Sequence, residues 1–515
     1  MARIHTTRSA RINQKLSPHV WNMSRVRRLL EVLTIATCRN SRANAFLCSL
    51  PLRSSNFEGK STQICTSKSI MTPIKSRETE RTARNAEGVD PTLIEQAKSL
   101  YRKTFGESSH GGHIICTAAP GRVNLIGEHV DYTGGFVLPM AIGFHTICYG
   151  FGSMVEIGEN SCVCRFVSTV NPDDVQTFEY PPKKNDIREG EWSNYVKGVV
   201  AQYMDHVPNG YTLNFEIAIS SNVPLGSGLS SSAALEVSVA RFVEEIVMKQ
   251  NNALTKEAKV ARALKCQKAE NEWCNSPCGI MDQFVSSAGE MGAVLLIDCE
   301  STEYEAYSFG GNDEEEKPTV VICNSNVTHS IGGGEYPIRV KQCAKALEAV
   351  NTVRKVKSLR HATMKDIEES RDSMDELIYR RARHVISENE RTKQAAEALK
   401  MGNYEAMGRL MNESHSSMRD DYEVSCSEID ALVDLAQVFS PQDAVYGSRL
   451  TGGGFGGCTV SLVRPKAVPA FIEHMKEEYT KWQQKRNGSS SSDDILKCTC
   501  FVTTPASGVQ LLHLS

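Results

Sequence analysis

The residues Val223-Pro-Leu-Gly-Ser-Gly-Leu-Ser-Ser-Ser-Ala-Ala-Leu-Glu-Val-Ser-Val-Ala240 decide the fold of this chain. Before them, residues 212–219 alternate between apolar and polar side chains, as a half-buried strand does. After them, Leu235 and Val239 recur at helical spacing, which predicts a helix that starts near Ser232. A strand, a glycine-rich turn and a helix in this order present free N–H groups and the positive end of a helix dipole. That combination favours phosphate binding.

The turn itself contains Gly226, Gly228 and the three hydroxyl residues 230–232. Glycine allows the backbone to approach a ligand closely, and the hydroxyls can cap the helix, contact phosphate oxygens or ligate Mg²⁺. A plain helix cap after a glycine-rich turn has the same composition, so the stretch alone leaves both interpretations open. No lysine follows the glycines, which excludes a Walker loop.

Composition excludes several classes of protein. The chain has 515 residues and a formal net charge of −3, which argues against a general nucleic-acid binder. No apolar run approaches the roughly 20 residues of a membrane helix. The 17 cysteines lack regular spacing and indicate reduced thiols. We therefore expect a cytoplasmic protein without nucleic-acid or membrane partners, and we expect a monomer.

The first part of the chain differs from the rest. Residues 1–57 contain ten Lys/Arg and a single acid, Glu31. This composition fits an organellar transit peptide within residues 1–70, and an unstructured extension, which we favour, fits it as well. We predict that residues 1–88 are a disordered or targeting extension and that the ordered chain begins near Pro91.

A second loop carries a group of polar side chains. A strand over 114–119 is broken at Pro120, a second short strand follows over 123–125, and the loop then begins at Gly127. Its polar residues are Glu128, His129, Asp131 and Tyr132. Arg122 is a nearby cation on the same unit. Loops on a rigid scaffold tend to carry function, although a solvated turn would have similar residues.

Two further features follow along the chain. Asp282 lies among apolar neighbours, so its carboxylate is either paired or functional, and a helix-terminal aspartate is the alternative. Five of the six residues 452–457 are glycine, which predicts a close backbone approach. The remaining periodicity predicts helices over 91–105, 255–272, 339–354, 365–371, 376–386, 390–400, 403–411, 427–438 and 466–484, and strands over 137–142, 293–298, 319–324, 458–463, 498–503 and 509–512.

Read together, these loops resemble the motifs of the galactokinase family. Residues 120–132, Pro-Gly-Arg-Val-Asn-Leu-Ile-Gly-Glu-His-Val-Asp-Tyr, resemble the galactokinase signature. Residues 224–234 resemble the ATP-binding motif of the GHMP small-molecule kinases, and residues 450–458 resemble the third motif of that superfamily. Residues 278–283 and 420–426 also match galactokinases. The resemblance covers about residues 91–515, in family order.

The resemblance implies a fold and a reaction. The fold is the α+β GHMP kinase fold, in which two α/β domains enclose the active site in the cleft between them. We predict an N-terminal domain over 89–317, with the sugar and ATP loops, and a C-terminal domain over 318–515. The reaction is transfer of the ATP γ-phosphoryl group to the C1 hydroxyl of α-D-galactose, the committed step of galactose breakdown.

The resemblance also implies a role for each site residue. Asp282 accepts or orients the C1 hydroxyl proton, and Arg122 orients Asp282 and stabilises developing charge. The galactose site consists of Arg122, Glu128, His129, Asp131, Gly279, Asp282 and Tyr336. The triphosphate loop consists of Gly226, Ser227, Gly228, Leu229, Ser230, Ser231 and Ser232. Ser232 and Glu270 hold Mg²⁺, so the implied ligands are galactose, ATP and Mg²⁺.

Other functions remain open at this stage. An N-acetylgalactosamine kinase, or another GHMP sugar kinase, would share most of these motifs. A non-catalytic sensor of galactose and ATP would do so too, but the sensors of this kind have a shortened serine stretch, and residues 230–233 are intact here. A nonspecific nucleotide-binding module would lack the sugar loop. The sequence departs from the family pattern at Val130 and Asn271, and neither change removes a charged group of the site.

Overall fold

The structure of this chain is a computed structural model. It describes residues 88–106, 114–158, 163–248, 254–310, 317–327, 335–487 and 495–514. Apart from Gly88, the predicted extension over residues 1–88 lies outside the described residues. Among the helices that the structure describes, none combines the length and the hydropathy needed to cross a membrane.

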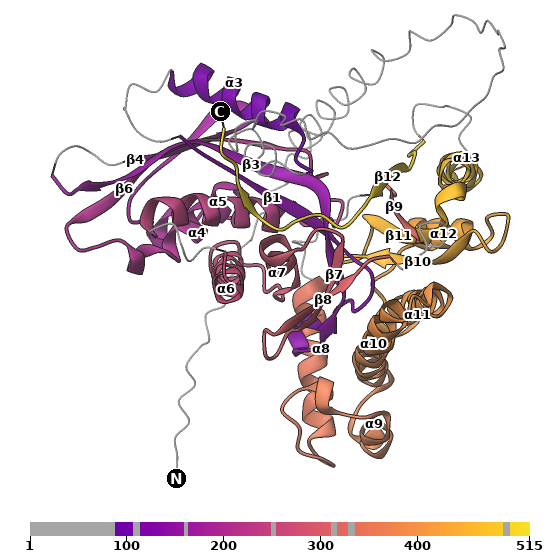
Figure 1. Cartoon of the computed structure of the whole chain (residues 1–515). Coiled ribbons are helices and arrows are strands. Elements are labelled where there is room, and N and C mark those ends of the chain that lie inside the picture. Colours follow the sequence, from indigo (N-terminus) through magenta and orange to yellow (C-terminus); the bar gives the residue numbers. More distant parts are fainter. Residues whose placement is uncertain are drawn as a thin grey trace, which may run out of the picture. The chain divides into compact units, whose positions relative to one another are not determined.

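A six-stranded sheet occupies one side of the fold, in the order β13-β1-β3-β6-β4-β5 (Figure 1). Its strands are β1 (Ile114–Asn124), β3 (Pro139–Glu156), β4 (Val163–Ser168), β5 (Asn171–Glu179), β6 (Tyr211–Ser221) and β13 (Gln510–Leu511). Neighbouring strands are antiparallel except β4 and β6, which are parallel. The end of the chain therefore returns to the edge of this first sheet through β13.

Helices cover both faces of this sheet. On one face lies α3 (Pro91–Phe105), and on the other lie α4 (Ser193–Ala201) and α5 (Ser231–Val247), with α6 (Lys256–Trp273) beyond them (Figure 1). The helix predicted over 91–105 is confirmed at those bounds. It begins there because the Asp90 side chain accepts a hydrogen bond from Thr92 N at 2.8 Å and proline occupies the first turn. The interior between α5 and the sheet contains an apolar cluster that includes Phe166, Phe215 and Phe242.

A four-stranded antiparallel sheet forms the other side of the fold, in the order β10-β11-β9-β12. Its strands are β9 (Thr319–Asn324), β10 (Val445–Thr451), β11 (Cys458–Val463) and β12 (Thr499–Thr503). Alternate residues of β9 face opposite cores, since Val321 packs towards α12 (Ser427–Gln437) and α13 (Val468–Asn487) and Val320 towards α11 (Tyr404–Ser417). The predicted strands over 293–298, 319–324 and 458–463 are confirmed at those bounds.

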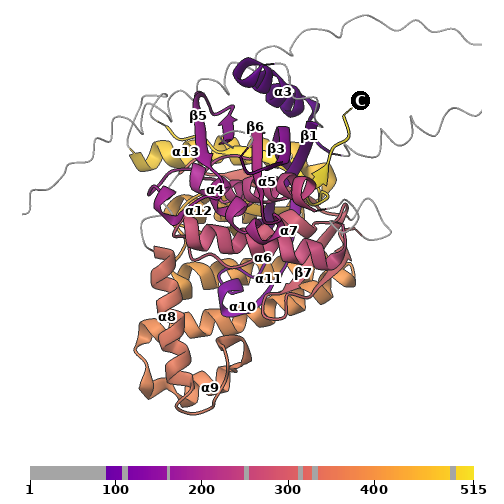
Figure 2. The same cartoon turned by 90° about the vertical axis from the view of Figure 1, so that its left-hand side faces the viewer.

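Smaller elements connect the two sheets. A three-stranded sheet contains β2 (Phe136–Val137), β7 (Ala293–Asp298) and β8 (Tyr304–Ser308), and the short helix α7 (Met281–Ala288) packs on β1 and β3. The helices α8 (Glu335–Val350) and α9 (Met364–Glu369) lie at one end of the fold, and α10 (Glu376–Lys400) runs beside α11 (Figure 2). The prediction of two helices over 376–386 and 390–400 is wrong, because one continuous helix spans both. The predicted strands over 114–119 and 123–125 likewise form one irregular strand, β1.

Candidate active site

An arginine–aspartate pair lies at the centre of the described loops. Arg122 lies near the end of β1 and its side chain is 5% exposed, and Asp282 occupies the first turn of α7, where the helix dipole favours a carboxylate. Nε and Nη2 of Arg122 donate to Oδ1 of Asp282 at 2.8 and 2.6 Å. The pairing register of β1 shifts between Pro120 and Arg122, and such an irregularity can redirect a side chain, here that of Arg122 towards Asp282. The structure therefore brings together the two residues predicted to be catalytic.

The pair is hydrogen-bonded to the glycine-rich loop that precedes α5. Backbone N of Arg122 donates to Leu229 O at 3.1 Å, and Nη1 of Arg122 donates to Gly228 O. The Ser230 hydroxyl donates to Oδ2 of Asp282 at 2.6 Å. Ser230 adopts a left-handed backbone with φ 62°, which a serine rarely adopts without compensation. Both oxygens of Asp282 are thus held, one by the arginine and one by this loop.

The two glycine-rich loops meet at backbone distance. A Cβ added to Gly452 would lie 2.8 Å from Gly228 O, and one added to Gly457 would lie 2.8 Å from Ser227 O, so larger residues cannot replace these glycines. The small hollow between the loops is lined by Gly226, Gly228, Thr451, Gly453, Gly454, Gly456 and Gly457. Because α5 begins at Ser231, its free N–H groups and half-buried Ser231 and Ser232 lie beside this hollow. A phosphate group suits such a backbone-lined site.

The predicted sugar loop is held by β10 and by Gly452, which follows it. Oε1 of Glu128, whose residue is 2% exposed, accepts from Gly452 N at 2.8 Å, and Arg449 lies 3.6 Å away. Burial raises the pKa of Glu128 above its usual value. His129 contacts the hydroxyl of Tyr132 at 3.2 Å through Nδ1 and Gly453 O at 3.3 Å through Nε2. Burial, and next the neighbouring His384, lower the pKa of His129 to about 3, so its ring is neutral at physiological pH.

Asp131 and Gly279 are in direct contact. A Cβ added to Gly279 would lie only 2.0 Å from Oδ2 of Asp131, so the carboxylate rests against the backbone of residue 279. Burial, and then the charge of nearby Asp282, raise the pKa of Asp131 to about 7. Asp131 therefore lies near Asp282 of the arginine–aspartate pair. The side chain of Tyr336, which was predicted to complete this site, lies outside the described residues.

Glu270 and Glu236 form a second acidic group near Asp282. Glu270, near the end of α6, accepts from Nε2 of Gln283 at 2.6 Å, and the same amide donates to Glu236 at 3.0 Å. Burial, and then the charge of Asp282, raise the pKa of Glu270 to about 7. Across the described part of the chain, no cluster of three or more His, Cys, Asp and Glu side chains forms a ready-made metal cage.

The sequence did not reveal that α10 supports the sugar loop. Oε1 of Glu388, a fully buried residue, accepts from Gly127 N at 2.9 Å and from Glu128 N at 3.1 Å. Oδ1 of Asn389 accepts from Phe136 N at 2.8 Å. The sequence offers no clear signal for this contact, because Glu388 and Asn389 lie within a continuous polar run over residues 387–394. We instead interpreted these residues as a break between two helices.

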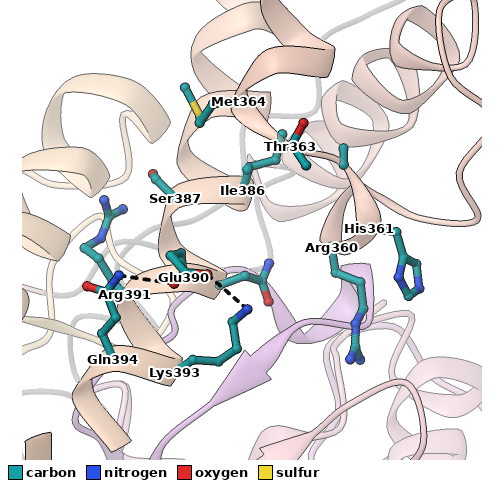
Figure 3. A pocket seen from close by; sticks show the side chains of 12 residues that line it. Arg360, His361, Thr363, Met364, Ile386, Ser387, Glu390, Arg391, Lys393 and Gln394 are labelled. Atoms are coloured by element: carbon teal, nitrogen blue, oxygen red, sulfur yellow. Dashed lines mark hydrogen bonds and ion pairs between the residues drawn. The ribbon is translucent and has the colours of Figure 1, made fainter. Parts of the chain in front are cut away.

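A separate cavity of about 520 Å³ lies between α10 and the segment that leads into α9 (Figure 3). Its lining includes Arg360, His361, Glu390 and Lys393. The charged groups already pair with acids: Arg360 with Asp298 and Glu300, His361 with Glu300, and Lys393 with Glu390. The cavity therefore offers little unpaired charge for a triphosphate, whereas the glycine-rich loops beside α5 offer backbone N–H groups and the start of a helix.

Family models match three segments of the chain. The galactokinase galactose-binding signature matches residues 99–150, the GHMP kinases N terminal domain matches residues 194–290 and the GHMP kinases C terminal matches residues 395–481. The fold and the site thus define a small-molecule kinase of the GHMP class.

Individual relatives narrow the class. The chain is 39% identical over 425 residues to the galactokinase of Bos taurus, with 82% of this chain and 97% of the relative covered. It is 41% identical over 391 residues to the galactokinase of Homo sapiens, with 75% and 92% covered. The crystal structure of Lactococcus lactis galactokinase complexed with galactose is 30% identical, has a TM-score of 0.69 and covers 81% of this chain and 99% of its own. The chain belongs to the galactokinase family.

Proposed function

We propose that this protein is a galactokinase, which transfers the γ-phosphoryl group of ATP to the C1 hydroxyl of α-D-galactose and releases galactose 1-phosphate and ADP. The observation that carries the proposal is the position of the Arg122–Asp282 pair. It contacts the glycine-rich loop through Gly228 and Ser230 and lies beside Asp131 of the sugar loop. A nucleotide on the first loop and a sugar on the second would meet at this pair.

Each residue of the pair has a distinct part in the transfer. The C1 oxygen forms a bond to the γ-phosphorus, the bond between that phosphorus and the β–γ bridging oxygen breaks, and its electron pair leaves with ADP. Asp282 orients the C1 hydroxyl and accepts its proton as the new ester forms. Arg122 holds Asp282 in place and offsets the negative charge on the transferring group. Catalysis of this kind depends mainly on position and charge.

The two loops supply binding. Residues 226–232 would hold the triphosphate through backbone N–H groups and hydroxyls, with the start of α5 favouring its negative charge. Glu128, His129, Asp131 and the backbone of Gly279 would contact the sugar hydroxyls, with Tyr336 closing the site. A buried hydroxyl that lost its partner would cost about 1–3 kcal/mol, so these contacts select among sugars.

The side chains of Ser232 and Glu270 are of the kinds that fit a magnesium ion. The Gln283 amide donates to both Glu270 and Glu236, and Oε1 of Glu236 is buried without a hydrogen-bond donor among the described residues. Mg²⁺ usually takes one or two carboxylates together with phosphate oxygens. Ser232 and Glu270 would hold it, and the ion would neutralise phosphate charge when bound.

A panel of sugars tests this function. Purified protein is incubated with Mg²⁺–ATP and galactose, N-acetylgalactosamine or glucose, and ADP release is measured alongside sugar binding. We expect ADP release with galactose at a kcat/KM well above that for the other two. A preference for N-acetylgalactosamine would identify the other kinase, and galactose binding without ADP release would identify a sensor. We also propose a cytoplasmic, monomeric protein, which imaging of the tagged full chain and light scattering would check.

A further inference from the structure

One buried amide connects two buried carboxylates beside the active site. Nε2 of Gln283 donates to Oε2 of Glu236 at 3.0 Å and to Oε2 of Glu270 at 2.6 Å. Glu236 and Gln283 are 0% exposed, and Glu270 is 7% exposed. A side-chain amide has two N–H donors, so a single NH₂ group can serve both carboxylates and fix their relative orientation.

This arrangement costs stability, because a buried carboxylate normally has a cation or a full set of donors. Oε1 of Glu236 has no hydrogen-bond partner among the described residues. Glu244 on the same helix shows the usual alternative, because Arg262 donates to both of its oxygens at 2.6–3.0 Å.

The position of Glu236 links it to the proposed metal site. Glu236 follows Ser232 by four residues in α5, and residues at this spacing lie on the same face of a helix. The other end of the bridge, Gln283, is next to Asp282 in α7. The bridge thus spans the three helices that carry Ser232, Glu270 and Asp282.

We propose that Glu236 is a positioning residue of the metal site, which acts through the Gln283 amide to orient the Glu270 carboxylate towards Ser232. Glu236 and Gln283 touch neither sugar nor phosphate in this role. The inference rests on the proposed function, since it requires Glu270 to be a metal ligand. Residues that hold a metal ligand in place typically contribute about 10- to 100-fold to metal affinity.

Metal binding and stability test the proposal together. Mn²⁺ binding in the presence of ADP is measured by electron paramagnetic resonance for the wild type, Glu236→Leu, Gln283→Leu and the control Glu244→Gln. Thermal unfolding of each is measured without metal, and galactose affinity without nucleotide. Leucine at 236 has a similar size but no acceptor for the Gln283 amide. We expect Glu236→Leu and Gln283→Leu to lower Mn²⁺ affinity by roughly 10- to 100-fold with unchanged galactose affinity. Glu236→Leu should also keep or raise the metal-free Tm, because it replaces a buried acid by an apolar side chain.

The control variant distinguishes a positioning role of Glu236 from a general effect on stability. Glu244→Gln breaks a buried ion pair, so it should lower the Tm and leave Mn²⁺ affinity unchanged. Wild-type Mn²⁺ affinity in Glu236→Leu would overturn the proposal, and so would a Tm loss like that of Glu244→Gln without a change in metal affinity. Wild-type Mn²⁺ affinity in Glu270→Gln would overturn it as well. ADP release from ATP and galactose by the wild type tests the kinase assignment independently, so the two failures are distinguishable.

Discussion

Replacing Gly279 by alanine tests the sugar site without changing any charged group. The added Cβ would lie 2.0 Å from Oδ2 and 2.1 Å from Cγ of Asp131, whereas ordinary contacts begin near 3.4 Å. The Asp131 carboxylate must therefore retreat by roughly 1 Å or more, because the interior is close-packed and backbone moves less easily than a side chain. Residue 279 has no positive φ, so alanine itself is not strained there.

The size of the effect follows from this displacement. A misplacement of about 1 Å at a positioning group costs about 10²-fold, or ~2.7 kcal/mol in transition-state binding. We expect kcat/KM for galactose to fall by about 10²-fold, mainly through KM. The KM for ATP should stay near the wild-type value, since Asp131 is not among the residues that line the glycine-lined hollow.

Steady-state kinetics with each substrate varied in turn provide the measurement. Gly143→Ala is the matched control, because a Cβ at Gly143 meets nothing within 4 Å. Asp131→Ala added to Gly279→Ala should cost less than Asp131→Ala alone, as expected for two residues that act through one contact. A folded Gly279→Ala protein with wild-type KM for galactose, or with equal losses for both substrates, would refute the placement of Asp131 in the sugar site.

Three further changes probe the same site. Asp282→Asn should lower kcat by roughly 10²–10⁴-fold with little change in galactose Kd, and Arg122→Ala should then cost less in that background than alone; a near-normal rate would make Asp282 structural. Ser230→Gly removes the hydroxyl bonded to Asp282 and relieves the positive φ, so kcat should fall by about 10-fold while the Tm holds, and unchanged kcat would contradict this role. The raised pKa of Asp131, about 7, means that the folded chain keeps a proton which the unfolded chain loses near its usual pKa of 3.8. Stability of the ligand-free protein should therefore rise as pH falls from about 8 to about 6, and melting curves of Asp131→Asn should show a smaller change.

Local signals in the sequence predicted the elements that frame the site. Asp90 and Pro91 mark the start of α3, and the hydroxyls after the glycine turn mark the start of α5, because caps and turns depend on adjacent residues. The same reasoning gave a helix start at Asp282 only as the alternative to a functional carboxylate, and Asp282 does lie in the first turn of α7. These features needed only the spacing of neighbouring residues, which a sequence displays directly.

Contacts between distant residues could not be read in this way. Arg449 lies 3.6 Å from Glu128 although 321 positions separate them, and Gly452 N donates to Glu128 at 2.8 Å. The same limit hid the role of α10, since only the backbone N–H groups of residues 127 and 128 explain why the Glu388 carboxylate is buried. The family resemblance supplied the roles of the site residues, but not the groups that hold them.

The charge balance around Asp282 explains why such a site would need a metal. The acids in this region are Glu128, Asp131, Glu236, Glu270 and Asp282, and the arginines that contact them are Arg122 and Arg449. These acids thus outnumber the arginines, and the raised pKa values of Glu128, Asp131, Glu236 and Glu270 indicate that protons offset part of the charge in the ligand-free protein. The triphosphate of ATP would add negative charge to the same region, and backbone N–H groups at the start of α5 would offset only part of it. A divalent ion carried in with the nucleotide would offset more of it, and the Gln283 amide links Glu236 to Glu270, the carboxylate that we propose as the ligand of that ion.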